Sequence, residues 1–172
     1  MTDRFAHHLK LHQIRDGDRV DLVADESERQ AIAERLGLNA LERFEAHAIL
    51  SRKGEMIRAE GRLQATLEQS CVVTSDPVAS HIDEPFDLMF TPAPGSGEPE
   101  EVELGETDCD VVFYDGAAID LGSAIADTLA LSIHPYPRSA GADATLKEAG
   151  VMSEAEASPF AALVKLRKND DF

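Results

Sequence analysis

The side chains best suited to chemistry in this sequence are its two cysteines, Cys71 and Cys109. A thiolate activated by a histidine is a common nucleophile, and His81 could serve Cys71 in that role. However, the alternating pattern around Cys71 directs its side chain inward on a strand, where cysteine behaves as a small hydrophobe. We therefore expect Cys71 to be buried and inert, and both thiols to be free rather than joined in a disulfide.

Metal and cofactor chemistry finds little support in the sequence. His7, His8 and His12 cluster near the N-terminus, but their spacing specifies no set of metal ligands. No Cys-x-x-Cys pair, phosphate-binding loop, dinucleotide fingerprint or Gly-x-Ser-x-Gly elbow is present. We expect no metal, no cofactor and no catalytic residue. An enzyme with an unrecognised site stays open as an alternative.

Basic side chains gather at the turn or on the polar face of a predicted hairpin: Arg52, Lys53, Arg58 and Arg62. Such side chains can contact the phosphates of a nucleic acid. The same face carries Glu60 and Glu68 and no aromatic ring on which a base could stack. Ion pairs between neighbouring strands are the alternative use of these arginines.

The chain is strongly acidic, with 33 Asp and Glu against 16 Lys and Arg and a net charge of −17. This charge disfavours nonspecific binding to nucleic acid, so DNA is not expected as a partner. It suits solubility, or a basic partner such as a ribosomal protein. No stretch approaches the ~18 apolar residues of a membrane span, and the N-terminus lacks an apolar signal core. The expected location is the cytoplasm.

The predicted elements are organised around one long strand at Ile57–Val73, where apolar and polar residues alternate. We expect Gly61 to bend or divide it. Residues 42–51 alternate in the same way and should pair with it antiparallel through the turn at 52–55. A third alternating run, at 82–90, completes an antiparallel meander.

Helices should cover one face of this sheet. Asp25 and Glu28 predict a capped helix at 26–36 that ends at Gly37. Asp120 predicts the start of a second, well buried helix, and residues 111–114 are predicted as a short buried strand. The expected fold class is α+β: an antiparallel meander, including the case of a strongly bent or barrel-like sheet, covered by a few helices.

The length of 172 residues favours a single domain over residues 1–172. Residues 92–108 are rich in proline, glycine and acids and are predicted as a mobile loop. Residues 139–157 are predicted as loop-rich with some helical content. Ser158 and Pro159 should begin a last short helix with an apolar side.

Several short motifs occur in an order that resembles one known family: 61–63, 71–74, 84–86, 119–122, 129–131, 135–138 and 158–163. The resemblance is to the YceD family, the large ribosomal RNA subunit accumulation proteins. Many of its members carry Cys-x-x-Cys where this chain has Cys71-Val72-Val73-Thr74. Because Thr74 cannot replace a thiolate as a soft metal ligand, a metal or redox role at Cys71 is not carried over.

The resemblance implies a single YceD-like domain and a cytoplasmic bacterial protein that affects the accumulation of large-subunit ribosomal RNA. It also implies a link to a large-subunit ribosomal protein and supplies no catalytic residues. We therefore expect a non-enzymatic ribosome biogenesis factor that binds a basic ribosomal protein or a pre-ribosomal particle. The candidate contacts are Arg58, Arg62, Tyr136, Arg138, Phe160 and Leu163.

Two points stay open at this stage. The segments 135–138 and 160–166 could instead pack within the molecule. The chain could also be an RNA-binding module that uses the basic face of the hairpin, in which case its affinity would depend strongly on salt.

Overall fold

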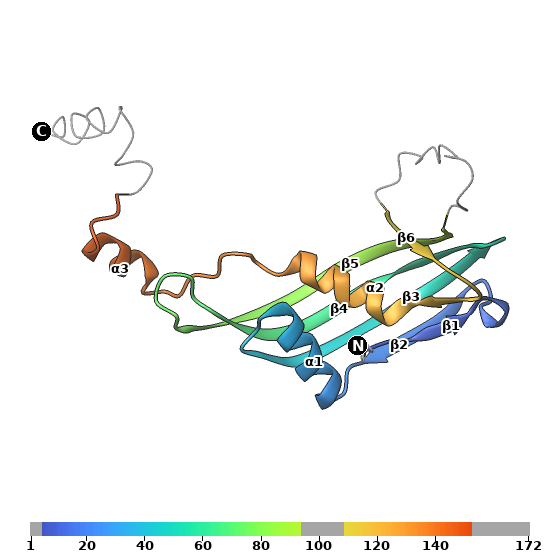
Figure 1. Ribbon diagram of the computed structural model, residues 1–172, viewed down its shortest axis with the longest axis horizontal. Helices are drawn as coiled ribbons and strands as arrows, with labels where there is room; N and C mark the ends of the chain where they lie inside the picture. The colour runs from blue at the N-terminus through green and yellow to red at the C-terminus, as the bar shows by residue number, and fades with distance from the viewer. Residues whose placement is uncertain (1–4, 94–108, 153–172) are drawn as a thin grey trace, which may run out of the picture. The chain divides into compact units, whose positions relative to one another are not determined.

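The computed structural model describes residues 5–93 and 109–152 and is an α+β protein (Figure 1). Its main sheet has five strands in the order β2-β3-β4-β5-β6. The bounds of these strands are Asp18–Val23 (β2), Ala40–Lys53 (β3), Met56–Ser70 (β4), Pro77–Pro92 (β5) and Asp110–Tyr114 (β6). The predicted meander is confirmed in β3–β5. The sheet is open rather than barrel-like, because β2 and β6 stand at its two ends.

The remaining elements are short. Strands β1 (His8–Lys10) and β7 (Ala118–Asp120) pair as a second sheet, and a 3-10 turn follows β1 at Leu11–Gln13. The helices are α1 (Glu26–Leu36), α2 (Leu121–Ser132) and α3 (Ala142–Glu148). The chain forms two compact units. Of the described residues, the larger unit holds 5–69, 79–93 and 109–135, and the smaller holds 70–78 and 136–152.

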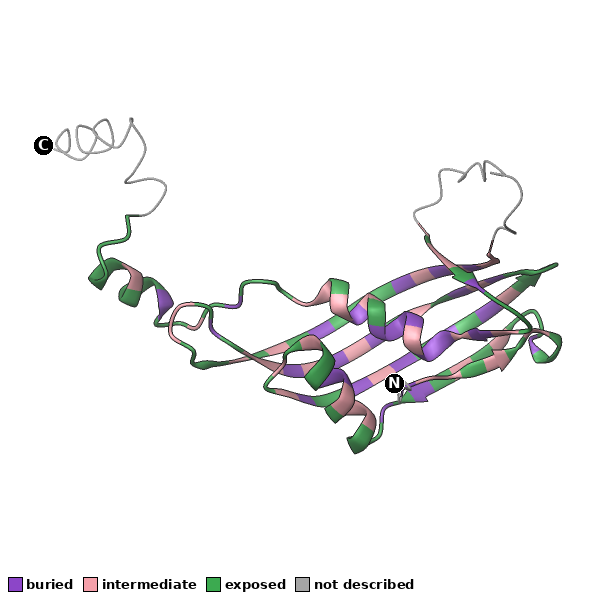
Figure 2. Cartoon of the chain, in the orientation of Figure 1, coloured by how far each residue is buried: buried purple, intermediate pink, exposed green. Residues whose placement is uncertain are grey.

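Strand β4 is the centre of the large unit, as its alternation predicts. Its apolar odd-numbered side chains expose 1% of their surface or less, whereas the even-numbered ones are half-buried or exposed (Figure 2); the buried ones are Ile57, Ala59, Leu63, Ala65 and Leu67. It pairs antiparallel with β3 along almost its whole length. The prediction that Gly61 divides this strand is wrong. Gly61 keeps its place opposite Ala48, and the only register shift between β3 and β4 lies at Leu41 and Arg43.

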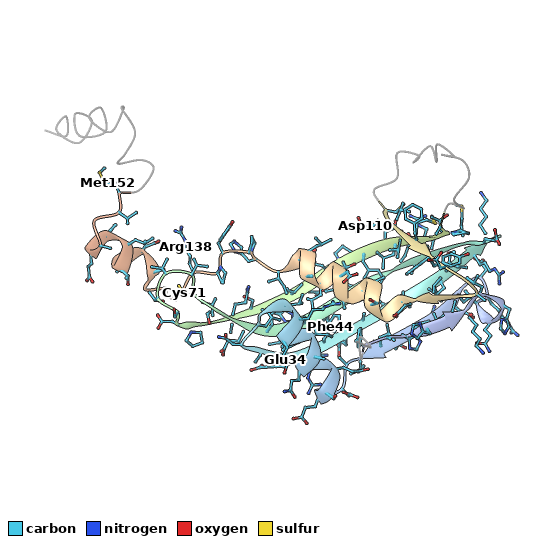
Figure 3. All side chains as sticks on the ribbon, viewed as in Figure 1. Glu34, Phe44, Cys71, Asp110, Arg138 and Met152 are labelled. Carbon is cyan, nitrogen blue, oxygen red and sulfur yellow. The ribbon has the colours of Figure 1, made fainter. Side chains whose placement is uncertain are left out.

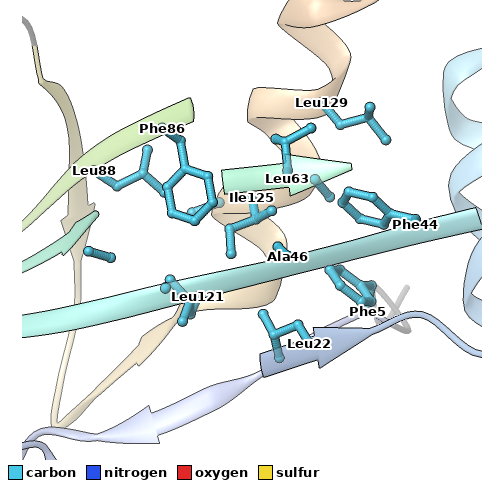
Figure 4. Packing of buried hydrophobic residues seen from close by; sticks show 14 of the residues in the cluster. Phe5, Leu22, Phe44, Ala46, Leu63, Phe86, Leu88, Leu121, Ile125 and Leu129 are labelled. Atoms are coloured by element: carbon cyan, nitrogen blue, oxygen red, sulfur yellow. The ribbon is translucent and has the colours of Figure 1, made fainter. Parts of the chain in front are cut away.

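The two longer helices contribute to one apolar core in the large unit (Figure 4). Helix α1 has the predicted bounds and both hydrogen bonds of the capping box between Asp25 and Glu28, and it is followed by Gly37. Helix α2 begins after Asp120, whose carboxylate accepts the N–H of Ser123 at 3.1 Å. Six of its twelve residues are buried, which confirms the prediction of a well buried helix.

Two features of the large unit differ from the expectations. Residues 111–114 are not a buried strand: β6 pairs parallel with β5 at the end of the sheet, and only Tyr114 in it is buried. The β1–β7 pair was not foreseen, because strands of three residues carry no measurable alternation. This pair joins the N-terminal segment to the start of α2, where Leu121 N–H donates to the carbonyl of His7 at 3.0 Å.

Candidate partner-binding sites

Arg58 and Arg62 lie on the solvent face of β4, as predicted, but both form ion pairs. Arg58 donates to both carboxylate oxygens of Asp87 on β5, at 2.9 and 2.5 Å, and its Nη2 lies 3.3 Å from Glu60. Arg62 pairs with Asp83 on the same neighbouring strand. The side chains of Arg58 and Arg62 remain 37% and 48% exposed. The cross-strand ion pairs considered above are therefore present.

These pairs stabilise the charged forms of their members. The hydrogen bonds that Arg58 donates to Asp87, together with the negative charge of that carboxylate, raise the pKa of Arg58. The hydrogen bonds from Arg58 lower the pKa of Asp87, and those from Arg62 lower the pKa of Asp83. A phosphate that bound either arginine would have to displace or share a carboxylate already in place. The arginines are accessible, but their charge is largely compensated.

The other predicted contacts belong to the small unit or lie beyond the described chain. Tyr136 is 69% exposed, and Arg138 lies 3.6 Å from Asp143 with its side chain 58% exposed. Figure 3 labels Arg138 on the segment before α3. Phe160 and Leu163 lie outside the described residues. The structure thus brings Tyr136 and Arg138 to the surface of one unit, and Arg58 and Arg62 to the surface of the other.

Cys71, labelled in Figure 3, has polar neighbours in the small unit that the sequence did not predict. Strand β4 ends at Ser70, so Cys71 lies in a turn rather than on a strand, although it is buried as expected. Its sulfur accepts the N–H groups of Val73 at 3.4 Å, Thr74 at 3.5 Å and Ser139 at 3.2 Å. The sulfur of Cys71 thus accepts hydrogen bonds both from its own turn and from a residue 68 positions later in the chain.

Hydroxyl groups complete this environment. The Thr74 hydroxyl donates to Asp76 at 2.6 Å and lies 3.0 Å from the hydroxyl of Ser139. Burial alone raises the pKa of the Cys71 thiol, but the hydrogen bonds from Ser139 and Thr74 together outweigh it and bring the pKa to about 6. The expectation that Cys71 is only a small hydrophobe is therefore wrong for its electrostatics, because its sulfur is hydrogen-bonded to polar groups.

The lowered pKa of Cys71 predicts a pH-dependent contribution to stability. A free thiol in the unfolded chain has a pKa of about 8.5, and the folded state lowers it to about 6. The contribution is therefore fully present above the unfolded pKa and lost as the pH falls through the folded pKa. We expect the difference in melting temperature between the native chain and Cys71→Ala to be larger at pH 9 than at pH 5.5, measured by scanning calorimetry.

The control for that experiment is Cys109→Ala, which removes the other thiol. Other titrating groups affect the native chain and the Cys71→Ala variant alike, so they cancel in the difference. A difference that stays constant with pH, or that grows toward acid, would show that the thiolate contributes nothing to folding.

Within residues 5–93 and 109–152, the remaining histidines and acids form no recognisable catalytic set. A surface depression brings His81, His134, Asp83 and Glu84 together, yet His81 lies 3.4 Å from Thr66 and Asp83 is paired with Arg62. Among the described residues, no group of three or more His, Cys, Asp or Glu side chains is placed to bind a metal ion. Nor does any described helix have the length and apolar character that crossing a membrane requires.

Sequence reasoning missed Ser139 and Asp76 as neighbours of Cys71, and Asp83 and Asp87 as partners of the arginines. The turn signal at 74–77 was visible, but nothing in the sequence links residue 139 to residue 71. The alternation of their predicted strand places both aspartates on its solvent side, so an acidic face could be predicted. Which arginine meets which aspartate depends on the register between β4 and β5.

Taken together, these features define an acidic α+β protein built on one open sheet of long strands. The chain belongs to the YceD family: the family described as "Large ribosomal RNA subunit accumulation protein YceD" matches residues 59–167, more than half of the chain. This confirms the resemblance stated above, and the description implies a role in the accumulation of large-subunit ribosomal RNA. The searches of curated proteins and of solved structures found no match.

Proposed function

We propose that this protein is a non-enzymatic, cytoplasmic factor in biogenesis of the large ribosomal subunit, acting by binding a basic ribosomal protein or a pre-ribosomal particle. The observation that carries the proposal is the family match over residues 59–167, whose description concerns ribosomal RNA accumulation rather than a reaction. The mode of action is inferred from the net charge of the chain and from the ion pairs that its arginines form.

The charge distribution supports a basic protein as the partner. No charged side chain of the described residues is buried, so the acids of this part of the chain all reach the surface. Five described arginines are already in ion pairs: Arg35, Arg43, Arg58, Arg62 and Arg138. With a net charge of −17, the surface would attract a strongly basic protein and repel a polyphosphate.

Naked RNA is the less favoured partner for the same reason. Phosphate contacts made by Arg58 or Arg62 would compete with Asp87 and Asp83. RNA binding through a few phosphates would weaken steeply with salt. The slope of log K against log salt concentration would become shallower by roughly one unit for each arginine removed. Replacing Arg58 or Arg62 by alanine should leave binding of a basic protein almost unchanged, because the acids that attract it remain.

The proposal predicts an RNase-resistant complex. Tagged protein should capture large-subunit ribosomal proteins from bacterial lysate after complete RNase digestion, and the bound proteins should be identified by mass spectrometry. Deleting the gene should lower the ratio of large- to small-subunit ribosomal RNA. Capture that disappears with RNase would favour direct RNA binding, and capture no better than a mock column would contradict the proposal.

A contact in the small unit can be tested in the same assay. Tyr136→Ala is expected to reduce capture at least about fivefold if Tyr136 anchors the partner, since central aromatic residues commonly contribute more than 1 kcal/mol. Val151→Ala is the matched control, because Val151 is also in the small unit and 52% exposed. Equal losses in the two variants would mean that Tyr136 is not a specific contact.

A further inference from the structure

Strand β2 is an end strand of the main sheet (Figure 1). Its pairing with β3 extends one residue beyond the strand, where Ala24 N–H donates to the carbonyl of Phe44 at 2.9 Å. Hydrogen-bonded and non-hydrogen-bonded pairs alternate along antiparallel strands. Val20 and Leu22 therefore direct their backbone groups toward β3, whereas Arg19 and Asp21 direct theirs outward. No backbone partner for these outward groups is found in the described chain.

Two charged side chains of opposite sign stand on this strand. Arg19 and Asp21 are exposed on the solvent face of β2, and neither forms an ion pair or side-chain hydrogen bond with another described residue. Farther into the same sheet, Arg58 and Arg62 are both paired with aspartates. An open strand edge usually carries charges that discourage pairing. Here one positive and one negative charge stand two residues apart, and that spacing is self-complementary.

We propose that β2 is a dimerisation edge, which pairs antiparallel with β2 of a second copy of this chain about a twofold axis at Val20. In this register Arg19 of each copy lies opposite Asp21 of the other, on the same face of the joined sheet. The outward N–H and C=O groups of Arg19 and Asp21 then face the outward groups of the second copy, because odd-numbered residues lie opposite odd-numbered residues. Val20 meets Val20 on the inner face, where it already packs against the core.

Neighbouring registers are disfavoured. An axis at Arg19 places two arginines opposite each other, and an axis at Asp21 does the same for two aspartates; like charges directly opposite destabilise a strand pair. An axis between two residues sets outward backbone groups against groups that are already bonded to β3. Among the registers centred within Arg19–Asp21, the charge pattern and the backbone parity thus favour the one centred on Val20.

The interface predicts a weak, concentration-dependent dimer. Six residues of strand bury little surface, and the two copies repel each other through their net charges of −17. A dissociation constant on the order of 10⁻⁵ M is expected, which is typical of small transient interfaces. The full chain should be examined by sedimentation velocity from low micromolar concentration to about 500 µM, in 0.15 M salt, where screening acts over about 8 Å.

Charge exchange tests the register directly. Arg19→Asp and Asp21→Arg should each weaken dimerisation at least tenfold, because each places like charges opposite one another. The double variant Arg19→Asp/Asp21→Arg should dimerise with itself as the native chain does, but should not form mixed dimers with the native chain. Lys147→Asp, which changes the net charge as Arg19→Asp does but lies in α3, should have no effect.

Circular dichroism and thermal melting of each variant separate a lost interface from a lost fold. A native chain that is monomeric at about 500 µM would overturn the proposal. So would a dimer that the single variants leave intact, because another surface would then be responsible. The proposal is independent of the ribosomal function, and neither result depends on the other.

Discussion

The variant Gly61→Ala is expected to lose about 3 kcal/mol or more of folding free energy, placing it among the most damaging single exchanges in this protein. A Cβ atom at residue 61 would lie 1.9 Å from the carbonyl oxygen of His47 and 2.9 Å from Cα of Ala48. It would also lie 2.8 Å from Cζ of Phe86. Since two of these atoms are backbone, no change of side-chain rotamer relieves the clash.

The damage should spread because β3 and β4 are the central pair of the large unit. Separating them at Gly61 strains the ladder on both sides, where Leu50 on one side and Leu63 on the other are almost wholly buried. For a chain of this size the loss corresponds to a fall of roughly 6–12 °C in melting temperature. Denaturant unfolding and scanning calorimetry would measure it, with amide hydrogen exchange reporting weaker protection across β3 and β4.

The control is Gly141→Ala. Gly141 has a φ of −87°, which alanine adopts freely, and no atom lies within 4 Å of the added Cβ. The same chemical change should therefore alter stability by less than about 1 kcal/mol. If Gly61→Ala is as mild as Gly141→Ala, then β3 and β4 do not approach each other as closely as the structure has them.

The variant Gly122→Ala should have the second largest effect, about 2–3 kcal/mol, and a different location. Its Cβ would lie 2.1 Å from the carbonyl oxygen of Phe5 and 2.9 Å from the N–H nitrogen of His7. The N-terminal segment must therefore move away from α2. That movement would break the hydrogen bond from His7 N–H to Asp120, at 2.9 Å, and would disturb Phe5, whose ring centre lies 4.8 Å from that of Phe44.

Hydrogen exchange distinguishes this variant from the first. Gly122→Ala should deprotect β1, β7 and the first turn of α2 while β3 and β4 keep most of their protection, because the contact lies at one end of the core. Gly61→Ala should show the reverse order. Unchanged exchange of β1 in Gly122→Ala would show that the N-terminal segment does not pack against the start of α2.

The elements predicted well are those whose information is local. The bounds of α1 follow from Asp25, Glu28 and Gly37, which act on backbone groups within four residues of themselves. The long strands follow from alternation, since one face of the sheet is buried and the other faces solvent. Family membership also followed from the order of short motifs along the chain.

The candidate site was only partly predictable. Arg58 and Arg62 were placed on the correct face of β4, because side-chain parity is a local property. Their pairing with Asp87 and Asp83 depends on the register between two strands, which parity does not specify. Phe160 and Leu163 lie outside the described residues and stay predictions.

By itself, then, the sequence determined the α+β class, the meander, the two capped helices and the acidic character of the surface. Only the tertiary structure decided three further matters: the parallel placement of β6, the close backbone approach at Gly61, and the polar groups that surround Cys71. The physical reason is the same in each case. These features depend on contacts between residues far apart in the chain, and such contacts leave no period, cap or turn signal in the local sequence.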